Sequence, residues 1–186
     1  MSVIPPELVV LLDECGTKES AHSAGTLREH LSGTHDLLKA WGNPDHVVLA
    51  GLFHSIYGTQ YFKVQSAQSS YRSRIQQGIG DEAENLAYLF CTVDRMGLAF
   101  ELDKPEPRLW DVFGECFVSV SPIVLQELVE IDVANSVEQY QRAKPMSPAQ
   151  LSHFKQKYAR CEPYVTSKAQ QAFERMLSCQ DVAVAV

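Results

Sequence analysis

The amino-acid sequence predicts an all-α protein that folds as a single domain. Several runs of the chain repeat apolar residues at the i, i+3, i+4, i+7 spacing of a helix with one buried side. Stop and start signals separate these runs, the clearest being Gly42, Asn43 and Pro44. A chain of 186 residues with 45% hydrophobic residues is long enough for one substantial core and short for two. We therefore expect one helical domain over residues 1–186, with its core over about 20–143 and C-terminal helices over 147–179.

The N-terminal part is predicted to hold a short helix and a helical hairpin. Residues 3–15 form the first helix, which ends at Gly16. The hairpin consists of one apolar-periodic run over 27–41 and a second that begins at Val47. The break between them supplies a helix stop, an N-cap and a proline at the first helical position.

The remaining elements follow in chain order. Residues 61–70 lack periodicity and are predicted to be a loop, after which helices cover 71–80 and 81–96, the second with Asp81 as N-cap or first-turn acid. Residues 97–120 are predicted to be irregular, with a short strand pair around 117–120. A long helix then runs from Ser121 to about Ala143, and two further helices cover 147–161 and 165–179.

The charge balance argues against a nucleic acid or an anionic membrane surface as partner. The chain holds 23 acidic and 16 basic residues, so its formal net charge is −7, and its isoelectric point is about 5.3. A protein of this sign is repelled by phosphate backbones and anionic headgroups, although a local basic pocket is compatible with it. The longest apolar runs are also too short to span a membrane.

The cysteines predict reduced thiols and a cytoplasmic location. Their number is odd, no two of them have CxxC spacing, and the N-terminal residues do not resemble a signal peptide. They are Cys15, Cys91, Cys116, Cys161 and Cys179.

Two histidines of the hairpin are predicted to face each other. His30 and His54 each lie twelve residues from Gly42, which is roughly 18 Å along each helix. Both also lie on the apolar side of their helix. Neutral imidazole is a common metal ligand, so the pair predicts a metal site. The alternative is a pair of core histidines that hydrogen-bond to the backbone or to each other.

The other histidines are predicted to lie away from this pair. His22 and His46 stand too far along the helices to share an ion with it, although they could line the same groove. His35 and His153 are predicted to face solvent.

A third candidate comes from the long helix. At 100° per residue, Asp132 falls within the apolar side of this helix, whereas Glu127, Glu130 and Glu138 fall on the opposite side. A buried carboxylate needs a partner, which predicts a metal ion, the end of a neighbouring helix that it caps, or an ion pair with Arg28, Arg72 or Arg95. Asn135 lies one turn further along, at the edge of the same side.

Taken together, these residues resemble the HD superfamily of helical metal-dependent phosphohydrolases. The resemblance consists of His30, the phrase AGLFHS with His54, and the phrase ELVEIDVAN with Asp132, and it spans roughly residues 20 to 140. The segment IGDEAENLAYLFCTV is similar to a helix of the (p)ppGpp synthetase/hydrolases, whose hydrolase domain looks most similar. HD-like domains with an AGLFHSxYGT phrase look similar too. The resemblance implies one divalent metal ion, iron or manganese, held by His30, His54 and Asp132, with Asp94 as a second choice for the carboxylate.

Three departures from the family pattern bear on the chemistry. Ser55 stands where the family has the aspartate of its His-Asp doublet, which removes a charged metal ligand. Gly58 and Thr59 stand where the alarmone hydrolases have a Glu-Asp pair, so no catalytic base is evident there. No histidine lies between His54 and Asp132, which disfavours a dinuclear site.

Residues just after His54 could hold a small anionic substrate against the metal. They mix hydroxyl groups with cations, and arginine and lysine both bind phosphate or carboxylate. The alternative is that the cations only solvate a loop and a helix. The predicted substrate-binding residues are Ser55, Tyr57, Lys63 and Arg72.

Three functions are consistent with these observations. The first is a metal-dependent hydrolase of a small phosphorylated or nucleotide-like molecule. The second is a mononuclear non-haem iron oxygenase or lyase, since two histidines and one carboxylate are the ligands of the facial iron triad. The third is a catalytically inactive domain that binds a ligand or a partner.

Overall fold

Helices of a computed structural model account for most of the chain, and the structure describes residues 4–18, 20–22, 25–58, 71–142 and 146–184. The first half holds α1 (Pro6–Glu14), α2 (Leu27–Trp41), α3 (Asp45–Phe53), α4 (Arg72–Ile79) and α5 (Asp81–Thr92). The second half holds α6 (Leu98–Glu101), α7 (Pro122–Arg142), α8 (Pro148–Cys161), the 3₁₀ turn η2 (Glu162–Tyr164) and α9 (Ser167–Val184). Two short hairpins pair β1 (Ala21–His22) with β2 (Gly25–Thr26), and β3 (Arg108–Asp111) with β4 (Cys116–Ser119). The predicted all-α class is confirmed.

Local capping chemistry sets the ends of the helices. The Thr26 hydroxyl accepts a hydrogen bond from the Glu29 backbone N–H, and the Glu29 carboxylate accepts one from the Thr26 backbone N–H. This capping box makes Leu27 the first residue of α2. At the other end Gly42 adopts the left-handed conformation, with φ of 87°, which ends α2 at Trp41. Ser147 and Gln150 form a second capping box at the start of α8.

Several predicted boundaries are shifted by a few residues. Pro44 is the N-cap of α3 rather than its first residue. For Asp81 the second of the two predicted alternatives is confirmed, since it lies in the first turn of α5 after Gly80 as N-cap. Helix α5 ends at Thr92 because Val93 is extended and bridges to Asp111 of β3. Helix α9 continues to Val184, past the predicted end at residue 179. The loop predicted over 61–70 lies outside the described residues.

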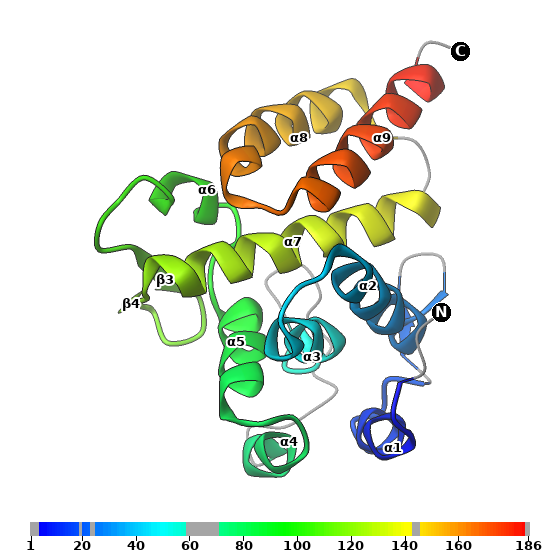
Figure 1. Cartoon of the computed structure of the whole chain (residues 1–186), viewed down its shortest axis with the longest axis vertical. Coiled ribbons are helices and arrows are strands. Elements are labelled where there is room, and N and C mark those ends of the chain that lie inside the picture. Colours follow the sequence, from blue (N-terminus) through cyan, green and yellow to red (C-terminus); the bar gives the residue numbers. More distant parts are fainter. Residues whose placement is uncertain (1–3, 19, 23–24, 59–70, 143–145, 185–186) are drawn as a thin grey trace.

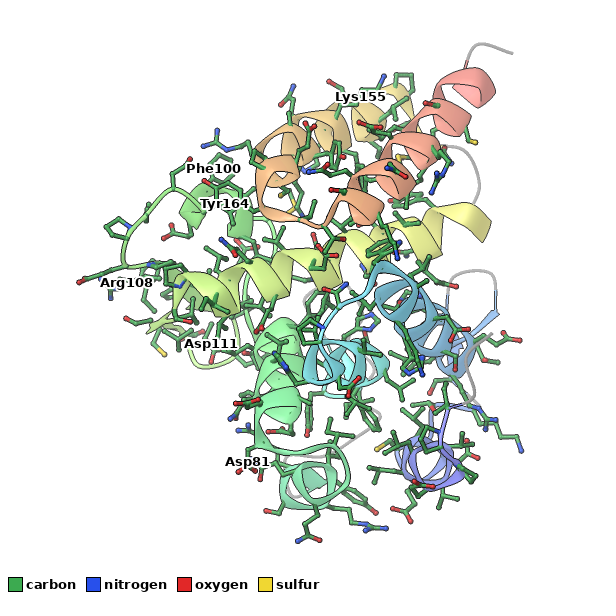
Figure 2. All side chains as sticks on the ribbon, viewed as in Figure 1. Asp81, Phe100, Arg108, Asp111, Lys155 and Tyr164 are labelled. Carbon is green, nitrogen blue, oxygen red and sulfur yellow. The ribbon has the colours of Figure 1, made fainter. Side chains whose placement is uncertain are left out.

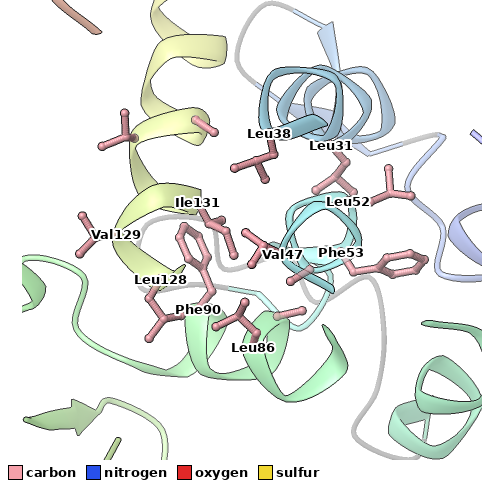
Figure 3. Close-up of a cluster of buried hydrophobic side chains, with 14 of the residues drawn as sticks. Leu31, Leu38, Val47, Leu52, Phe53, Leu86, Phe90, Leu128, Val129 and Ile131 are labelled. Carbon is pink, nitrogen blue, oxygen red and sulfur yellow. The ribbon is translucent and has the colours of Figure 1, made fainter. Parts of the chain in front are cut away.

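Helix α7 is the central element of the fold. Figure 1 shows it running between the pair α8 and α9 on one side and the helices α2, α3 and α5 on the other. Buried apolar residues from α1 to α9 form one continuous cluster, which supports a single domain. Figure 3 shows part of this cluster, where Phe90 of α5, Val47 of α3 and Ile131 of α7 lie together.

The central position of α7 corrects the prediction for its acidic residues. Glu130 and Glu138 were predicted to face away from the apolar side, yet both are buried, as is Asp132. A helix that is covered by neighbours on both sides has no solvent-facing side over its middle turns, so its polar residues must be paired internally. Glu130 accepts hydrogen bonds from the Asn43 amide and from the backbone and hydroxyl of Thr166, which tie α7 to α9 and to the α2–α3 turn.

The predicted strand pair is present as the β3–β4 hairpin. It pairs Arg108 with Ser119 at its open end and Asp111 with Cys116 at its turn. Trp110 and Phe117 are directly opposite each other, with ring centroids 5.1 Å apart, and both rings are largely exposed. In the part of the chain that the structure describes, no helix combines the length and the apolar character needed to cross a membrane.

Candidate functional site

The two hairpin histidines meet at the point where α2, α3 and α7 pack together. His30 lies in the first turn of α2, and His54 is the residue directly after α3. Their Nε2 atoms are 3.1 Å apart, and both side chains are buried. The prediction that these two imidazoles face each other is therefore confirmed.

The third polar atom at this point belongs to Asn135 of α7. Its Oδ1 lies 3.0 Å from Nε2 of His30 and 3.1 Å from Nε2 of His54. The three atoms thus form a nearly equilateral triangle inside the protein. We call His30, His54 and Asn135 the buried triad.

The outer nitrogen of each imidazole is held by a hydrogen-bond acceptor. Nδ1 of His54 donates to the backbone carbonyl of Gly51 at 2.7 Å. Nδ1 of His30 donates to the carboxylate of Glu138, which is one turn beyond Asn135 on α7. Carbonyl and carboxylate oxygens only accept hydrogen bonds, so both Nδ1 atoms carry hydrogen and both Nε2 atoms are directed into the triad.

Burial keeps His54 neutral. The side chain is completely enclosed, and this burial lowers the pKa of His54 well below its ordinary value, with His30 beside it lowering it further. A neutral His54 with hydrogen on Nδ1 has a free electron pair on Nε2. With Oδ1 of Asn135 directed at the histidines, the triad presents acceptor atoms to one another, and a shared proton or a cation among them would satisfy all three.

The geometry and the chemistry of the triad both fit a divalent metal ion. Three donor atoms on one face of an octahedral ion lie about 3 Å apart when each bond is about 2.1 Å long. The carboxylate behind His30 is the outer partner that metal-bound histidines usually have, because it fixes the tautomer and makes the ligand more basic. The residues present therefore fit such an ion, with Asn135 as the oxygen donor.

Asp132 does not join the two histidines. Its carboxylate accepts hydrogen bonds from Arg95, with Nη1 at 3.4 Å, and from Lys157 of α8. Among the described residues no three His, Cys, Asp or Glu side chains are grouped so as to hold a metal ion. The predicted ligand set of His30, His54 and Asp132 is corrected accordingly, whereas the alternative prediction of an ion pair with Arg95 is confirmed. The rotation of α7 about its own axis directs Asn135, three residues after Asp132, toward the histidines instead.

The predicted substrate-binding residues have other partners. Arg72 makes two hydrogen bonds of 2.7 Å with the carboxylate of Glu84, and the Tyr57 hydroxyl donates to the same carboxylate at 2.8 Å. Glu84 is completely buried, so Arg72 and Tyr57 neutralise and hydrogen-bond an internal carboxylate and are not directed at a substrate. Ser55 is buried beside His54, and Lys63 lies outside the described residues.

Two further histidines differ from their predicted surroundings or role. His35, predicted to face solvent, is buried in α2, where burial lowers its pKa. His153 is exposed as predicted, yet it lines a cavity.

This cavity opens beside the buried triad, between α7 and α8. Its volume is about 480 Å³, and Asn135 belongs to its wall as well as to the triad. A volume of this size suits a small organic ligand. The polar part of its wall includes Arg95, Asp132, Asn135, Tyr140, His153 and Lys157.

The cavity wall carries more positive than negative charge. Arg95 and Lys157 contribute two cations, and Asp132 contributes one carboxylate that binds both of them. The Arg95 guanidinium also lies 4.6 Å from the centre of the Phe90 ring, which makes a T-shaped contact with the His54 ring. Asp132 and Phe90 thus hold Arg95 in place between the cavity and the triad.

Sequence reasoning missed Asn135, Glu138 and Lys157 as members of this site. A signal for the first two exists, since residues three apart lie on the same side of a helix. The apolar residues around Asp132 instead led to the prediction that Asp132 is the polar residue that faces the histidines. Nothing in the sequence pattern indicates that Lys157, from a different helix, meets the same cavity.

Fold and site together define an all-α, single-domain protein with a buried imidazole-amide triad next to a cationic cavity. Residues 11–95 match the profile of a family described as a domain of unknown function, DUF6817. The matched segment is less than half of the chain and contains both histidines of the triad, whereas Asn135, Glu138 and Lys157 lie beyond it. No curated protein matches the chain, and no solved structure matches it.

Proposed function

We propose that this protein is a metal-dependent hydrolase of a small phosphorylated molecule, with one divalent ion held by His30, His54 and Asn135. The observation that carries the proposal is the triangle of Nε2, Nε2 and Oδ1 atoms, 3.0 to 3.1 Å apart, beside a cavity with two cations in its wall. The resemblance to HD phosphohydrolases points in the same direction. When bound, a divalent ion polarises a phosphoryl oxygen and makes a water molecule more acidic.

The ligand atoms are compatible with manganese or ferrous iron. Imidazole nitrogen suits iron, and amide oxygen suits manganese. Ser55 stands where the HD pattern has the aspartate of its doublet, and Asn135 rather than Asp132 meets the histidines, so the triad itself has no negative charge. Glu138 supplies one behind His30, and the charge makes that imidazole a stronger ligand. The iron-oxygenase alternative is less well supported, because its facial triad needs a carboxylate where this site has an amide.

Arg95 and Lys157 are the groups that would bind the phosphoryl oxygens. Arginine binds two oxygens at once, and lysine acts as a point charge. Both are held at the cavity wall by Asp132, so they need little reorganisation when an anion enters. Asp132 thus has a positioning role in this proposal, in place of the ligand role predicted from the sequence.

His153 is the cavity residue best suited to move a proton. Imidazole is the side chain most often used for this purpose in enzymes. His153 lies on α8 one helical turn before Lys157, so a proton can pass to or from the substrate near the bound anion. This assignment supplies a proton-transfer group that the segment after His54 lacks.

The test is metal binding and phosphate release measured on the same set of variants. Wild-type protein is expected to bind one manganese or ferrous ion in equilibrium dialysis and to release phosphate from a panel of phosphate monoesters. His54→Ala is expected to lose both properties. Asn135→Asp is expected to bind the ion more tightly, because it adds a negative charge among the donors.

The matched control is His46→Ala. This histidine lies at the other end of α3, where it pairs with Glu127 at 2.7 Å, outside the triad. It is expected to leave metal binding and hydrolysis unchanged. A wild-type protein that binds neither ion would overturn the proposal and favour a binding domain without a metal.

A further inference from the structure

A second cavity continues from the first along α6 and α8. Its volume is about 470 Å³, and Met96, His153 and Lys157 line both cavities. The shared residues make the two spaces neighbours, with Lys157 and His153 at the boundary. The second space reaches from there to Ala99, Phe100 and Arg160.

The two cavities differ in chemistry. Both have apolar side chains in their walls, such as Phe154 in the first, but the first adds the charges of Asp132 and Arg95, whereas the second adds Ala99, Phe100 and Arg160. Phe100 is 61% exposed, although α6 packs against α8 beside it. Figure 2 shows Phe100 on α6 beside the end of α8. An exposed aromatic ring in the wall of a cavity offers apolar surface that a ligand can cover.

Arg160 holds the Phe100 ring in position. Its guanidinium carbon lies 4.7 Å from the centre of the ring, and its Nε–H donates to the backbone carbonyl of Ala99 at 3.4 Å. Close by, the Tyr164 hydroxyl donates to Asp103 at 2.6 Å, which ties the end of α8 and η2 to the segment after α6. Phe100 is thus a fixed apolar surface at the far end of the two cavities.

We infer that the substrate is an organic anion with an attached apolar group, which lies on Phe100 while the anionic end lies at Lys157 and Arg95. This inference rests on the proposed function, because it assigns the substrate class of the same site. The apolar group is a ring or a chain of a few carbons, and both would be attracted to Phe100, Ala99 and Met96 by burial of apolar surface. When an anion without such a group binds, the apolar surface of the second cavity stays exposed to water.

The experiment compares three phosphate monoesters that differ only in the group attached. Methyl, phenyl and n-hexyl phosphate are titrated into the full chain by calorimetry, once with a chelator and once with manganese, and phosphate release is followed separately. Phenyl or hexyl phosphate is expected to bind about tenfold more tightly than methyl phosphate in both conditions. Stronger binding of phenyl phosphate indicates a ring, and stronger binding of hexyl phosphate indicates a chain.

Phe100→Ala is expected to remove this preference and to leave the affinity for methyl phosphate unchanged. Phe100 is exposed, so the variant should retain its fold, which thermal denaturation checks. The matched control is Phe113→Ala, a phenylalanine of similar exposure at the turn of the β3–β4 hairpin, which is expected to keep the preference.

The outcomes separate this inference from the proposed function. A preference that depends on Phe100, without any phosphate release, supports the substrate class and overturns the hydrolase. Phosphate release with equal affinity for the three esters overturns the substrate class alone. If none of the esters binds, both are overturned.

Discussion

Replacing Arg72 by methionine distinguishes the structural role of this residue from the substrate-binding role that the sequence suggested. The guanidinium makes two hydrogen bonds of 2.7 Å with the completely buried Glu84 and lies 3.8 Å from the centre of the Tyr88 ring. Removing it leaves a buried carboxylate with the Tyr57 hydroxyl and the Gln76 amide as its remaining donors in the described structure.

The expected loss follows from the burial of the two partners. Breaking a fully buried ion pair costs about 3–5 kcal/mol, because one charge is left without its partner. The Arg72 side chain is 30% exposed, so solvent screens part of this interaction. We therefore expect Arg72→Met to lower the free energy of unfolding by about 2–3 kcal/mol.

Urea denaturation followed by circular dichroism measures this change. Arg74→Met is the matched control, since Arg74 is more exposed and its nitrogen lies 3.4 Å from Glu14, so a loss below about 0.5 kcal/mol is expected. The double variant Arg72→Met/Glu84→Met should lose less than the sum of the single changes, because it leaves no unpaired charge. An Arg72→Met protein that is as stable as the wild type, but no longer binds phosphate esters, would refute this reasoning and restore the substrate-binding interpretation.

Three further predictions test the triad and the packing around it. Glu138→Gln is expected to lower manganese affinity about 10- to 100-fold in equilibrium dialysis, because outer partners of metal ligands have effects of this size; unchanged affinity would exclude Glu138 from the site. Gly51→Ala places a Cβ 2.2 Å from Cδ1 of the buried Leu38 at the α2–α3 contact. The free energy of unfolding, measured by urea denaturation, should therefore fall by about 1–3 kcal/mol. An unchanged free energy would mean that the Leu38 side chain moves aside without cost. In native protein between pH 7 and 9, a thiol reagent should modify the exposed Cys116 and Cys179 and spare the other three cysteines. The reason is that burial raises the pKa of Cys15 and Cys161 to about 11 and that of Cys91 to about 12. All five should react after denaturation, and fast modification of Cys91 in native protein would contradict its burial.

The histidine pair could be predicted because everything that places it is local. Gly42 ends one helix and turns the chain, and the constant rise of an α-helix then brings residues equally distant from the turn to the same level. The side of the helix that bears apolar residues indicates which way His30 points. These steps need only neighbouring residues, and the structure agrees with them.

The third member of the triad could not be predicted in the same way. The pattern of α7 favoured a single apolar side that included Asp132, but the helix is covered on both sides, and its middle turns are buried all round. For such a helix periodicity does not indicate which polar residue meets which neighbour. Only the packing of α7 against α2 and α3 places Asn135 and Glu138 at the histidines, and only its packing against α8 places Lys157 at Asp132.

Except for α6, which lies in a segment predicted to be irregular, the helices, most of their ends and the hairpin that brings His30 and His54 together follow from the sequence. Capping residues, the left-handed glycine and apolar periodicity act within one or two turns, so they are readable without knowledge of the fold. Three features do not follow from local sequence: which oxygen joins the histidines, which cations hold Asp132 and where the cavities open. These depend on how helices from distant parts of the chain rotate and pack against each other, which short-range pattern does not specify.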